Sequence, residues 1–375
     1  MKVLITDPVD DICISIIKNS GLEYQYIPES GKKEKLDAIQ DAHGLIVRSG
    51  TIVDERMLDC ASNLKVIGRA GVGVDNIDII NATRKGVVVM NTPDVNTISA
   101  AEHAIALILT ISRNPHIGHY DLINGIWSRN NLIGTELQNK ILGIIGLGKI
   151  GREVMERCLS FRMKIMGYDP FINKELFSQS DIEITDLDNV VQKADFLTLH
   201  LPLNDKTRNL FDFNRLKMMK KSAKIINVAR GGIINEHDLS KALNQSLISG
   251  AAIDVFEQEP LNKSNPLLSA KNILLTPHLG ASTIEAKKGV SRAISEQIRD
   301  YLLDSKLANA INMPISNMSL LNDIKPYLKL GELLGDIISQ LNDDSIIKII
   351  IECQGSAEEL RPISLAILKG ILSPN

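Results

Sequence analysis

The sequence has few cysteines, no long apolar run and no block of charge of one sign. Its four cysteines, Cys13, Cys60, Cys158 and Cys353, are isolated, which excludes a disulfide framework and the ligand spacing of a zinc site. No apolar run approaches the roughly 20 residues that a membrane-spanning helix needs. The 42 basic and 45 acidic side chains are interspersed, so no basic patch suggests nucleic acid or an anionic membrane as a partner. These absences predict a cytoplasmic protein with reduced thiols.

A targeting segment and a metal site are also not expected. The N-terminus MKVLITDPVDD carries a single lysine and reaches Asp7 after four apolar or hydroxyl residues, which predicts a first β-strand and not a signal peptide. His116 and His119 form an HxxH pair, but no third ligand lies nearby and the flanking pattern is that of a surface helix. A chain of 375 residues is too long for one ordinary core, so two or three domains are expected.

Short apolar strands alternate with amphipathic helical patterns along most of the chain, which is typical of α/β proteins with parallel sheets. A largely apolar helix is predicted from Ile98 to about Arg113, followed by a polar connector with the only tryptophan, Trp127. Two doubly wound, Rossmann-like domains are therefore expected. The predicted strands are 2–7, 44–49, 65–70 and 87–92 in the first block, and 141–146, 164–169, 196–202, 223–229, 250–256 and 272–277 in the second.

The strongest local motif is ILGIIGLGKIG, in which Gly146, Gly148 and Gly151 have the spacing GxGxxG. In a dinucleotide site the first glycine permits a tight turn, the second lets the backbone approach the pyrophosphate, and the third lets helix and strand pack closely. The N-terminus of the helix that follows offers free N–H groups to phosphates. A strand before the motif and a helix after it make a chance match improbable.

The next predicted strand ends in Asp169, 18 positions past the last glycine of the motif. A carboxylate at this place can accept hydrogen bonds from the adenosine ribose, and its charge would repel a 2′-phosphate. The predicted cofactor is therefore NAD and not NADP.

Three polar side chains follow neighbouring strands of the second block. Arg230 follows the strand 223–229, Glu259 lies just past 250–256, and His278 comes directly after 272–277. Because the carboxyl ends of parallel strands meet at one edge of a sheet, these side chains can converge on one small anion. Arg230 can bind a carboxylate bidentately, His278 can take a hydroxyl proton, and Glu259 can fix the ring tautomer. Each could alone be a turn or loop residue, but together they predict a dehydrogenase site.

The sequence resembles the D-isomer-specific 2-hydroxy-acid dehydrogenase family from Lys2 to about Met313. The resemblance rests on motifs in fixed order, among them VIGRAGVGVDNID, SAAEHAIALIL, ILGIIGLGKIGREV, NVARGGIINE, AAIDVFEQEP and PHLGAST. It implies that Arg230, Glu259 and His278 are the catalytic residues. It implies an NAD site formed by Val72, Gly146, Gly148, Lys149, Ile150, Gly151, Asp169, Leu201, Val228, Ala229, Arg230, Asp254, His278, Gly280 and Ala281. It implies a substrate site formed by Arg48, Ser49, Arg69, Gly71, Val72, Gly73, Arg129, Arg230 and His278.

The resemblance also says how some of these residues compare with those of relatives and what they would bind. Val72 stands where some relatives carry threonine near the nicotinamide, which removes one hydroxyl contact. Arg129 matches an arginine that relatives place near the substrate of a neighbouring subunit. Arg48 and Ser49 suit a phosphate, while the loop 69–73 can present backbone N–H groups to a carboxylate.

The resemblance also implies a domain order. Residues 1–94 and 283–312 would form a discontinuous, flavodoxin-like substrate-binding domain, with the NAD-binding domain 95–282 inserted and a hinge between them. Residues 313–375, read as helix, strand (345–355) and helix, resemble the opening of a regulatory domain of longer relatives. The serine-sensing domain of those relatives does not follow, so we expect either a truncated chain or a protein that lacks this end.

The resemblance is strongest to the branch of the family that acts on a phosphorylated substrate. It implies oxidation of D-3-phosphoglycerate to 3-phosphohydroxypyruvate, the first step of L-serine biosynthesis, by a homodimer or homotetramer that associates through 98–113 and the Trp127 connector. Two alternatives stay open: a reductase of glyoxylate, hydroxypyruvate or another 2-keto acid, and an NAD-sensing interaction module. The intact set of Arg230, Glu259 and His278 argues against the last.

Overall fold

The structure is a computed structural model of the 375-residue chain, and it describes residues 1–172, 182–313, 320–341, 346–352 and 360–372. The chain divides into two compact units. The first unit consists of Met1–Val95 and Lys287–Asn375, and the second of Asn96–Ala286. The second unit is thus inserted into the chain of the first. The predicted inserted segment, 95–282, begins one residue before the second unit begins and ends four residues before the second unit ends.

The first unit contains a five-stranded parallel sheet in the order β2-β1-β3-β4-β5. Four of these strands were predicted from the sequence, and the edge strand β2 was missed because EYQY has no apolar run. The strands are β1 (Lys2–Ile5), β2 (Glu23–Tyr26), β3 (Gly44–Val47), β4 (Val66–Arg69) and β5 (Val88–Asn91). The helices are α1 (Asp11–Asn19), α2 (Lys32–Ala38), α3 (Glu55–Cys60), α4 (Ile79–Arg84) and α11 (Ile284–Asp304).

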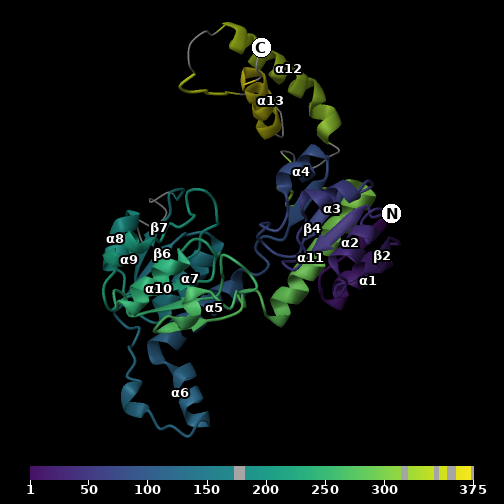
Figure 1. Ribbon diagram of the computed structural model, residues 1–375. Coiled ribbons are helices and arrows are strands. Elements are labelled where there is room, and N and C mark those ends of the chain that lie inside the picture. The colour runs from purple at the N-terminus through teal and green to yellow at the C-terminus, as the bar shows by residue number, and fades with distance from the viewer. Residues whose placement is uncertain (173–181, 314–319, 342–345, 353–359, 373–375) are drawn as a thin grey trace. The chain divides into compact units, whose positions relative to one another are not determined.

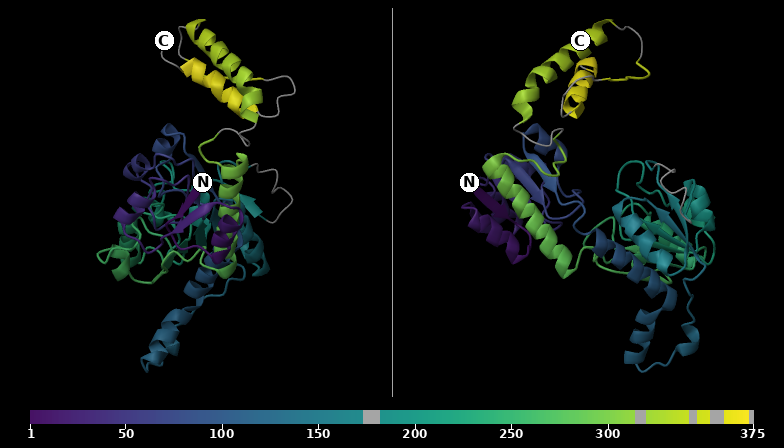
Figure 2. Two further views of the ribbon diagram at one scale, coloured as in Figure 1. Left: turned by 90° about the vertical axis from the view of Figure 1, so that its right-hand side faces the viewer. Right: turned by 180° about the vertical axis from the view of Figure 1, so that it is seen from behind.

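Both faces of this sheet are buried at the strands other than the edge strand β2, since alternate side chains of β1, β3, β4 and β5 enter different cores. Helices α2, α3 and α4 cover one face, and α1 and α11 cover the other. Figure 2 shows α11, in light green, lying along the sheet of this unit. It approaches closely because β4 carries Gly68, where a Cβ would lie 2.7 Å from the side chain of Ile294.

The second unit contains a seven-stranded parallel sheet in the order β12-β11-β10-β9-β6-β7-β8. The chain runs from β6 outward to β8 and then returns to place β9 beside β6, so the topological switch point lies between β6 and β9. The sequence predicted six of the seven strands. The strands are β6 (Ile141–Ile145), β7 (Lys164–Tyr168), β8 (Ile182–Ile184), β9 (Phe196–Leu199), β10 (Lys224–Asn227), β11 (Gly250–Ile253) and β12 (Ile273–Leu275).

Helices cover both faces of the second sheet (Figure 1). One face packs against α5 and α7, and the other against α8, α9 and α10. Strand β8 was missed because it is a three-residue edge strand, IEI, with a glutamate at its centre. These helices are α5 (Thr97–Arg113), α7 (Lys149–Ser160), α8 (Leu187–Lys193), α9 (Phe213–Met218) and α10 (Glu236–Asn244).

An arm formed by residues 114–135 leaves the second unit after α5. It contains α6 (Pro115–Ile123), which has no buried residue, and the short helix η1 (Arg129–Asn131). Figure 1 shows α6 standing away from the sheet of its own unit. The surface helix predicted around His116 and His119 is confirmed, and the described residues contain no group of three potential metal ligands.

The C-terminal segment contributes two helices, α12 (Leu320–Leu341) and α13 (Leu360–Leu372), that pack against each other. Glycines allow their backbones to meet, since a Cβ at Gly335 would lie 2.1 Å from the carbonyl oxygen of Ile367. The predicted strand 345–355 is wrong for its described part, because residues 346–352 form no strand. In the part of the chain that the structure describes, no neighbouring strand pairs with these residues. A lone strand can neither form hydrogen bonds with all its backbone N–H and C=O groups nor bury its side chains. Ile347 is accordingly 98% exposed. Residue 345 and residues 353–355 of that prediction lie outside the described residues.

Among the described helices, none is both long and apolar enough to span a lipid bilayer.

Candidate active site

The GxGxxG loop follows β6 at the carboxyl edge of the second sheet, beside the switch point. Gly146 has φ +96°, and a Cβ there would lie 2.3 Å from the carbonyl oxygen of His200. A Cβ at Gly151 would lie 2.1 Å from the carbonyl oxygen of Gly146. Both glycines are therefore required by the protein itself, for the turn and for the contact between α7 and the loop.

Gly148 differs from its two neighbours in the motif. It is the N-cap of α7, has φ −66°, and a Cβ on it would meet nothing within 4 Å. The protein alone therefore does not require glycine at this position. The open space lies at the N-terminus of a 12-residue helix, where free N–H groups and the helix dipole attract an anion. This geometry fits a dinucleotide whose pyrophosphate lies against the glycine backbone.

Asp169 follows β7, the strand beside β6, and its carboxylate binds two backbone groups. One oxygen accepts a hydrogen bond from Leu147 N and the other from Phe171 N, each at 2.9 Å. The first bond ties Asp169 to the glycine loop. Each carboxylate oxygen can accept a further bond, and the side chain is partly exposed, so both oxygens remain able to bind ribose hydroxyls.

The other residues predicted to bind NAD also lie at this edge, with one exception. Val72 belongs to the first unit, in the loop after β4. Those of the second unit are Lys149 and Ile150 in the first turn of α7, Leu201 after β9, Val228, Ala229 and Arg230 after β10, Asp254 after β11, and His278, Gly280 and Ala281 after β12.

His278 and Glu259 are in direct contact. The distance from His278 Nδ1 to Glu259 Oε2 is 2.6 Å, and Glu259 Oε1 accepts a hydrogen bond from Phe256 N at 3.0 Å. Burial raises the pKa of Glu259, but the hydrogen bonds from His278 and Phe256 outweigh it and hold that pKa below its ordinary value. The carboxylate therefore stays ionised and orients the ring through Nδ1, which leaves Nε2 of His278 as the ring nitrogen able to exchange a proton.

The turn that carries Arg230 packs against the turn that carries Glu259. A Cβ at Gly231 would lie 1.9 Å from the carbonyl oxygen of Phe256, so the two backbones touch. Asn227, at the end of β10, organises the turn: its side chain donates to Arg230 O at 2.9 Å and accepts from Ala229 N at 3.0 Å. The three loops with the predicted catalytic residues are thus joined in a chain of contacts.

Arg48 directly follows β3 and Arg69 is the last residue of the neighbouring strand β4, so both lie at the same edge of that sheet. Asn76 connects them: its amide nitrogen donates to Arg48 O at 2.7 Å, and its oxygen accepts from Arg69 Nε at 3.1 Å. The buried Asp7 accepts hydrogen bonds from Arg48 N at 2.6 Å and from Thr51. Ser49 is exposed beside Arg48, and Gly71, Val72 and Gly73 follow Arg69.

Arg129 lies in η1, on the arm of the second unit, and its side chain is exposed. It therefore belongs to a different element from the strand-end loops that carry His278 and Glu259. Its contact with the substrate of another subunit stays a prediction.

Asn227, Asn76 and Asp7 were missed in the sequence. Each acts on backbone groups that are distant in the chain or lie within a turn, and no motif marks such contacts. The only available signal was their position, since Asp7 ends the predicted strand 2–7 and Asn227 lies near the end of the predicted strand 223–229.

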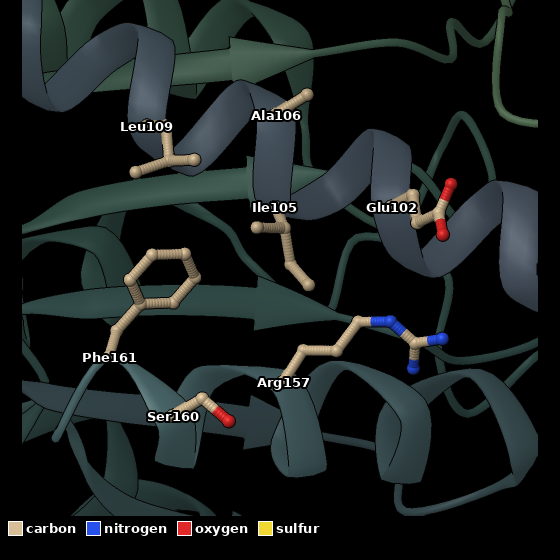
Figure 3. A pocket seen from close by; sticks show the side chains of 7 residues that line it. All are labelled: Glu102, Ile105, Ala106, Leu109, Arg157, Ser160 and Phe161. Carbon is tan, nitrogen blue, oxygen red and sulfur yellow. The ribbon is translucent and has the colours of Figure 1, made fainter.

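A surface depression lies elsewhere on the second unit, between α5 and α7. Figure 3 shows Glu102, Ile105 and Leu109 of α5 facing Arg157 of α7 and Phe161 after it. None of the predicted cofactor or catalytic residues lines it.

Comparison with known proteins gives two family matches. Residues 105–280 match the family model of the D-isomer specific 2-hydroxyacid dehydrogenase NAD binding domain. Residues 323–375 match the D-3-phosphoglycerate dehydrogenase intervening domain. The cofactor NAD, predicted from Asp169 and the glycine loop, is confirmed by the first match.

Curated relatives and solved structures agree with these matches. The chain is 44% identical to D-3-phosphoglycerate dehydrogenase of Methanocaldococcus jannaschii, over 100% of the chain and 72% of that protein. It is 42% identical to the protein of that name from Synechocystis sp., over 99% of the chain and 67% of that protein. It resembles the TT0316 protein of Thermus thermophilus (TM-score 0.76, 30% identity, 83% of this chain and 100% of that one). It also resembles an NAD-dependent formate dehydrogenase of Staphylococcus aureus in complex with NAD (TM-score 0.76, 28% identity, 83% and 99%).

Proposed function

The chain belongs to the D-isomer-specific 2-hydroxyacid dehydrogenase family, and we propose that it oxidises D-3-phosphoglycerate to 3-phosphohydroxypyruvate, the first step of L-serine biosynthesis. The observation that carries the proposal is the contact of His278 with Glu259 at the sheet edge that also holds the glycine loop. The named activity of the relatives and the match to the intervening domain support the phosphorylated substrate.

Each of these side chains has its own role in the proposed reaction. His278 Nε2 takes the proton of the substrate hydroxyl, and Glu259 holds the ring through Nδ1 and stabilises its protonated form. Arg230 binds the substrate carboxylate with paired hydrogen bonds. Bound NAD supplies the hydride acceptor. Lys149 and the backbone of Gly148 would hold the pyrophosphate at the N-terminus of α7, and Asp169 would hold the ribose.

In the first unit we propose that Arg48 and Ser49 bind the substrate phosphate. Asp7 and Asn76 each form hydrogen bonds with the backbone of Arg48 and of Thr51, which fixes the loop from which the arginine side chain projects. The loop 69–73 offers backbone N–H groups to the carboxylate. Charge-assisted hydrogen bonds of a guanidinium to a phosphate are among the strongest that side chains form.

A substrate panel tests the proposal. Steady-state kcat/KM should be highest for D-3-phosphoglycerate and at least about 100-fold lower for D-glycerate and D-lactate. Arg48→Gln should lower kcat/KM for the phosphorylated substrate by roughly 10- to 100-fold, since a bond to a charged group contributes about 1.5–3 kcal/mol. Arg84→Gln, at an exposed arginine on α4, is the matched control and should change little. Equal kcat/KM for phosphorylated and unphosphorylated acids would remove the phosphate from the proposal.

The same panel decides the alternatives. A reductase of glyoxylate or hydroxypyruvate would turn over those 2-keto acids faster than 3-phosphohydroxypyruvate. An NAD-sensing interaction module would bind NADH without turnover of any acid tested.

Asp169 should determine the choice of cofactor. We expect Asp169→Asn to bring kcat/KM for NADP to within about tenfold of that for NAD, because the amide keeps the shape of the side chain and removes the charge that repels a 2′-phosphate. Initial rates with both cofactors measure this. If the wild-type protein already used NAD and NADP equally, Asp169 would not be the ribose ligand.

Glu259 should control the pH dependence of the reaction. The pKa of its carboxyl is held below its ordinary value, so it is ionised at neutral pH and stabilises the protonated ring of His278. In Glu259→Gln a neutral amide replaces the carboxylate that contacts the ring, so the charge that favours the protonated ring is lost. The acid limb of the profile of kcat/KM for oxidation should therefore move to lower pH. A profile that coincides with the wild type would exclude this role for Glu259.

We also propose that two copies associate through helix α5 and the arm that carries Trp127. The arm exposes large apolar side chains, including Tyr120, Ile123, Trp127 and Ile133, with Trp127 at 80% exposure. Exposed apolar surface of this extent marks a protein interface. Sedimentation should show a dimer or tetramer for the wild type and dissociation for Trp127→Glu, whereas Ile80→Glu in the first unit should leave the assembly intact. A monomeric wild type would contradict the proposal.

The phosphorylated acid and a second copy of the chain are the only partners proposed. The cytoplasmic location expected from the composition stays a prediction.

A further inference from the structure

The turn that carries His278 has an unfavourable backbone conformation that the structure holds from several sides. His278 has φ +54°, in the left-handed region that residues with a Cβ rarely adopt. Its N–H donates to Asp254 O at 2.8 Å. The next two N–H groups, of Leu279 and Gly280, donate to the carboxylate oxygens of Asp254 at 2.8 and 3.0 Å. The position of the imidazole therefore depends on where the carboxylate of Asp254 lies.

Asp254 is itself completely buried, with 0% of its surface exposed. A buried carboxylate is stable only when its oxygens are paired and hydrogen-bonded. Besides the two backbone N–H groups, Thr276 Oγ1 donates to Oδ1 at 2.6 Å, and His103 Nε2 lies 3.1 Å from the same oxygen. Burial raises the pKa of Asp254, but the hydrogen bonds from His103, Thr276 and Leu279 outweigh it and keep that pKa below its ordinary value.

His103 lies on α5, and a second residue of that helix reaches the same turn. Ser99 precedes His103 by one helical turn, so both side chains lie on one face of α5. Ser99 Oγ donates to Gly280 O at 2.8 Å, and the side chain is 9% exposed. Helix α5 thus contacts the turn 278–280 directly through Ser99 and indirectly through His103 and Asp254.

We propose that Ser99 and His103 are positioning residues that hold His278 in its reactive orientation. The proposal rests on the proposed role of His278 as proton acceptor, and it extends that role to a helix that carries none of the residues assigned to substrate or cofactor. His103 keeps the carboxylate of Asp254 in place, Asp254 fixes the backbone of the turn, and Ser99 fixes the carbonyl oxygen of Gly280. A displacement of the imidazole by about 1 Å can lower a rate by roughly 100-fold, so small shifts of α5 matter.

The full chain with saturating NAD is used to test this. His103→Leu should lower kcat by roughly 10- to 100-fold with a change in KM of less than about threefold, since the substrate contacts are elsewhere. His103→Gln can place an amide N–H near the position of Nε2 and should recover kcat to within about threefold of the wild type. Ser99→Ala should lower kcat by a smaller factor. Thr110→Ala is its control, because the hydroxyl of Thr110 bonds only within α5, to Ala106 O.

A double-mutant cycle separates positioning from a general effect on the fold. If His103 acts through His278, adding His103→Leu to His278→Ala should cost no further activity. A structural defect would instead multiply the two losses. Should His103→Leu unfold, the cycle is run with Ser99→Ala, and the thermal midpoint is measured for each variant.

The proposal is overturned if His103→Leu keeps wild-type kcat, if the leucine and glutamine variants are equally impaired, or if the losses multiply with His278→Ala. These outcomes leave the proposed function intact, since that depends on turnover of D-3-phosphoglycerate by the wild type and its loss in His278→Ala. Wild-type protein without such turnover would instead remove the proposed function itself.

Discussion

Replacement of His278 by alanine is expected to lower kcat by roughly 10² to 10⁴, the range for loss of a general acid or base. The imidazole is held by Glu259 through Nδ1, so Nε2 is the atom that exchanges a proton with the substrate. Alanine removes that atom and leaves the glycine loop and Asp169 unchanged. Stopped-flow or steady-state rates at saturating NAD measure the loss.

Two controls make this result specific. NADH affinity, from fluorescence titration, should change by less than about threefold in His278→Ala. His237→Ala, at an exposed histidine of α10, should retain wild-type kcat. Activity within tenfold of the wild type in His278→Ala would show that another group accepts the proton.

Gly231→Ala is expected to combine loss of stability with loss of activity. The added Cβ would lie 1.9 Å from Phe256 O, 2.0 Å from Phe256 C and 2.6 Å from Glu257 N. All three atoms belong to the backbone, so the loops of Arg230 and Glu259 must move apart. Overpacking costs typically about 1–3 kcal/mol, and we expect a loss of free energy of unfolding at the upper end of that range. Because the two loops position the arginine and the histidine, kcat/KM should also fall by about 100-fold or more.

Denaturant unfolding and kinetics test this variant together. Gly31→Ala is the control, since a Cβ at Gly31 meets nothing within 4 Å and its backbone is extended. It should change the free energy of unfolding by less than about 1 kcal/mol. Wild-type stability in Gly231→Ala would show that the loops are not packed as described.

Parts of the molecule could be predicted from the sequence where a local residue pattern is typical of only one structure. Buried parallel strands are mostly apolar, so β6 or β10 stands out, whereas the edge strand β2 has no apolar run and the edge strand β8 has only three residues, and both were missed. The glycine spacing 146–148–151 predicted its own structure because two of the three positions have no room for a Cβ. The strand expected at 345–355 shows the opposite case, since β propensity produces a strand only where a partner is available.

The supporting residues of the site could not be predicted for a different reason. The contact of Ser99 with Gly280 spans 181 positions, and that of Asn76 with Arg48 spans 28. Such contacts arise from the packing of whole elements and leave no periodicity or spacing in the sequence. Glu259 and His278 were found only because both follow predicted strands whose ends must meet.

The insertion of the second unit has a consequence for folding during synthesis. Helix α11 supplies Val290, Ile294 and Ile298 to the core on one face of the first sheet, but the ribosome makes it only after the whole segment 96–286. At about 5–20 residues per second this interval lasts on the order of 10–40 seconds. Throughout it, the apolar face formed by β3, β4 and β5 has no helix to cover it beyond α1. The nascent first unit therefore presents the kind of surface that chaperones bind, and the second unit, whose segments are contiguous, is expected to fold first.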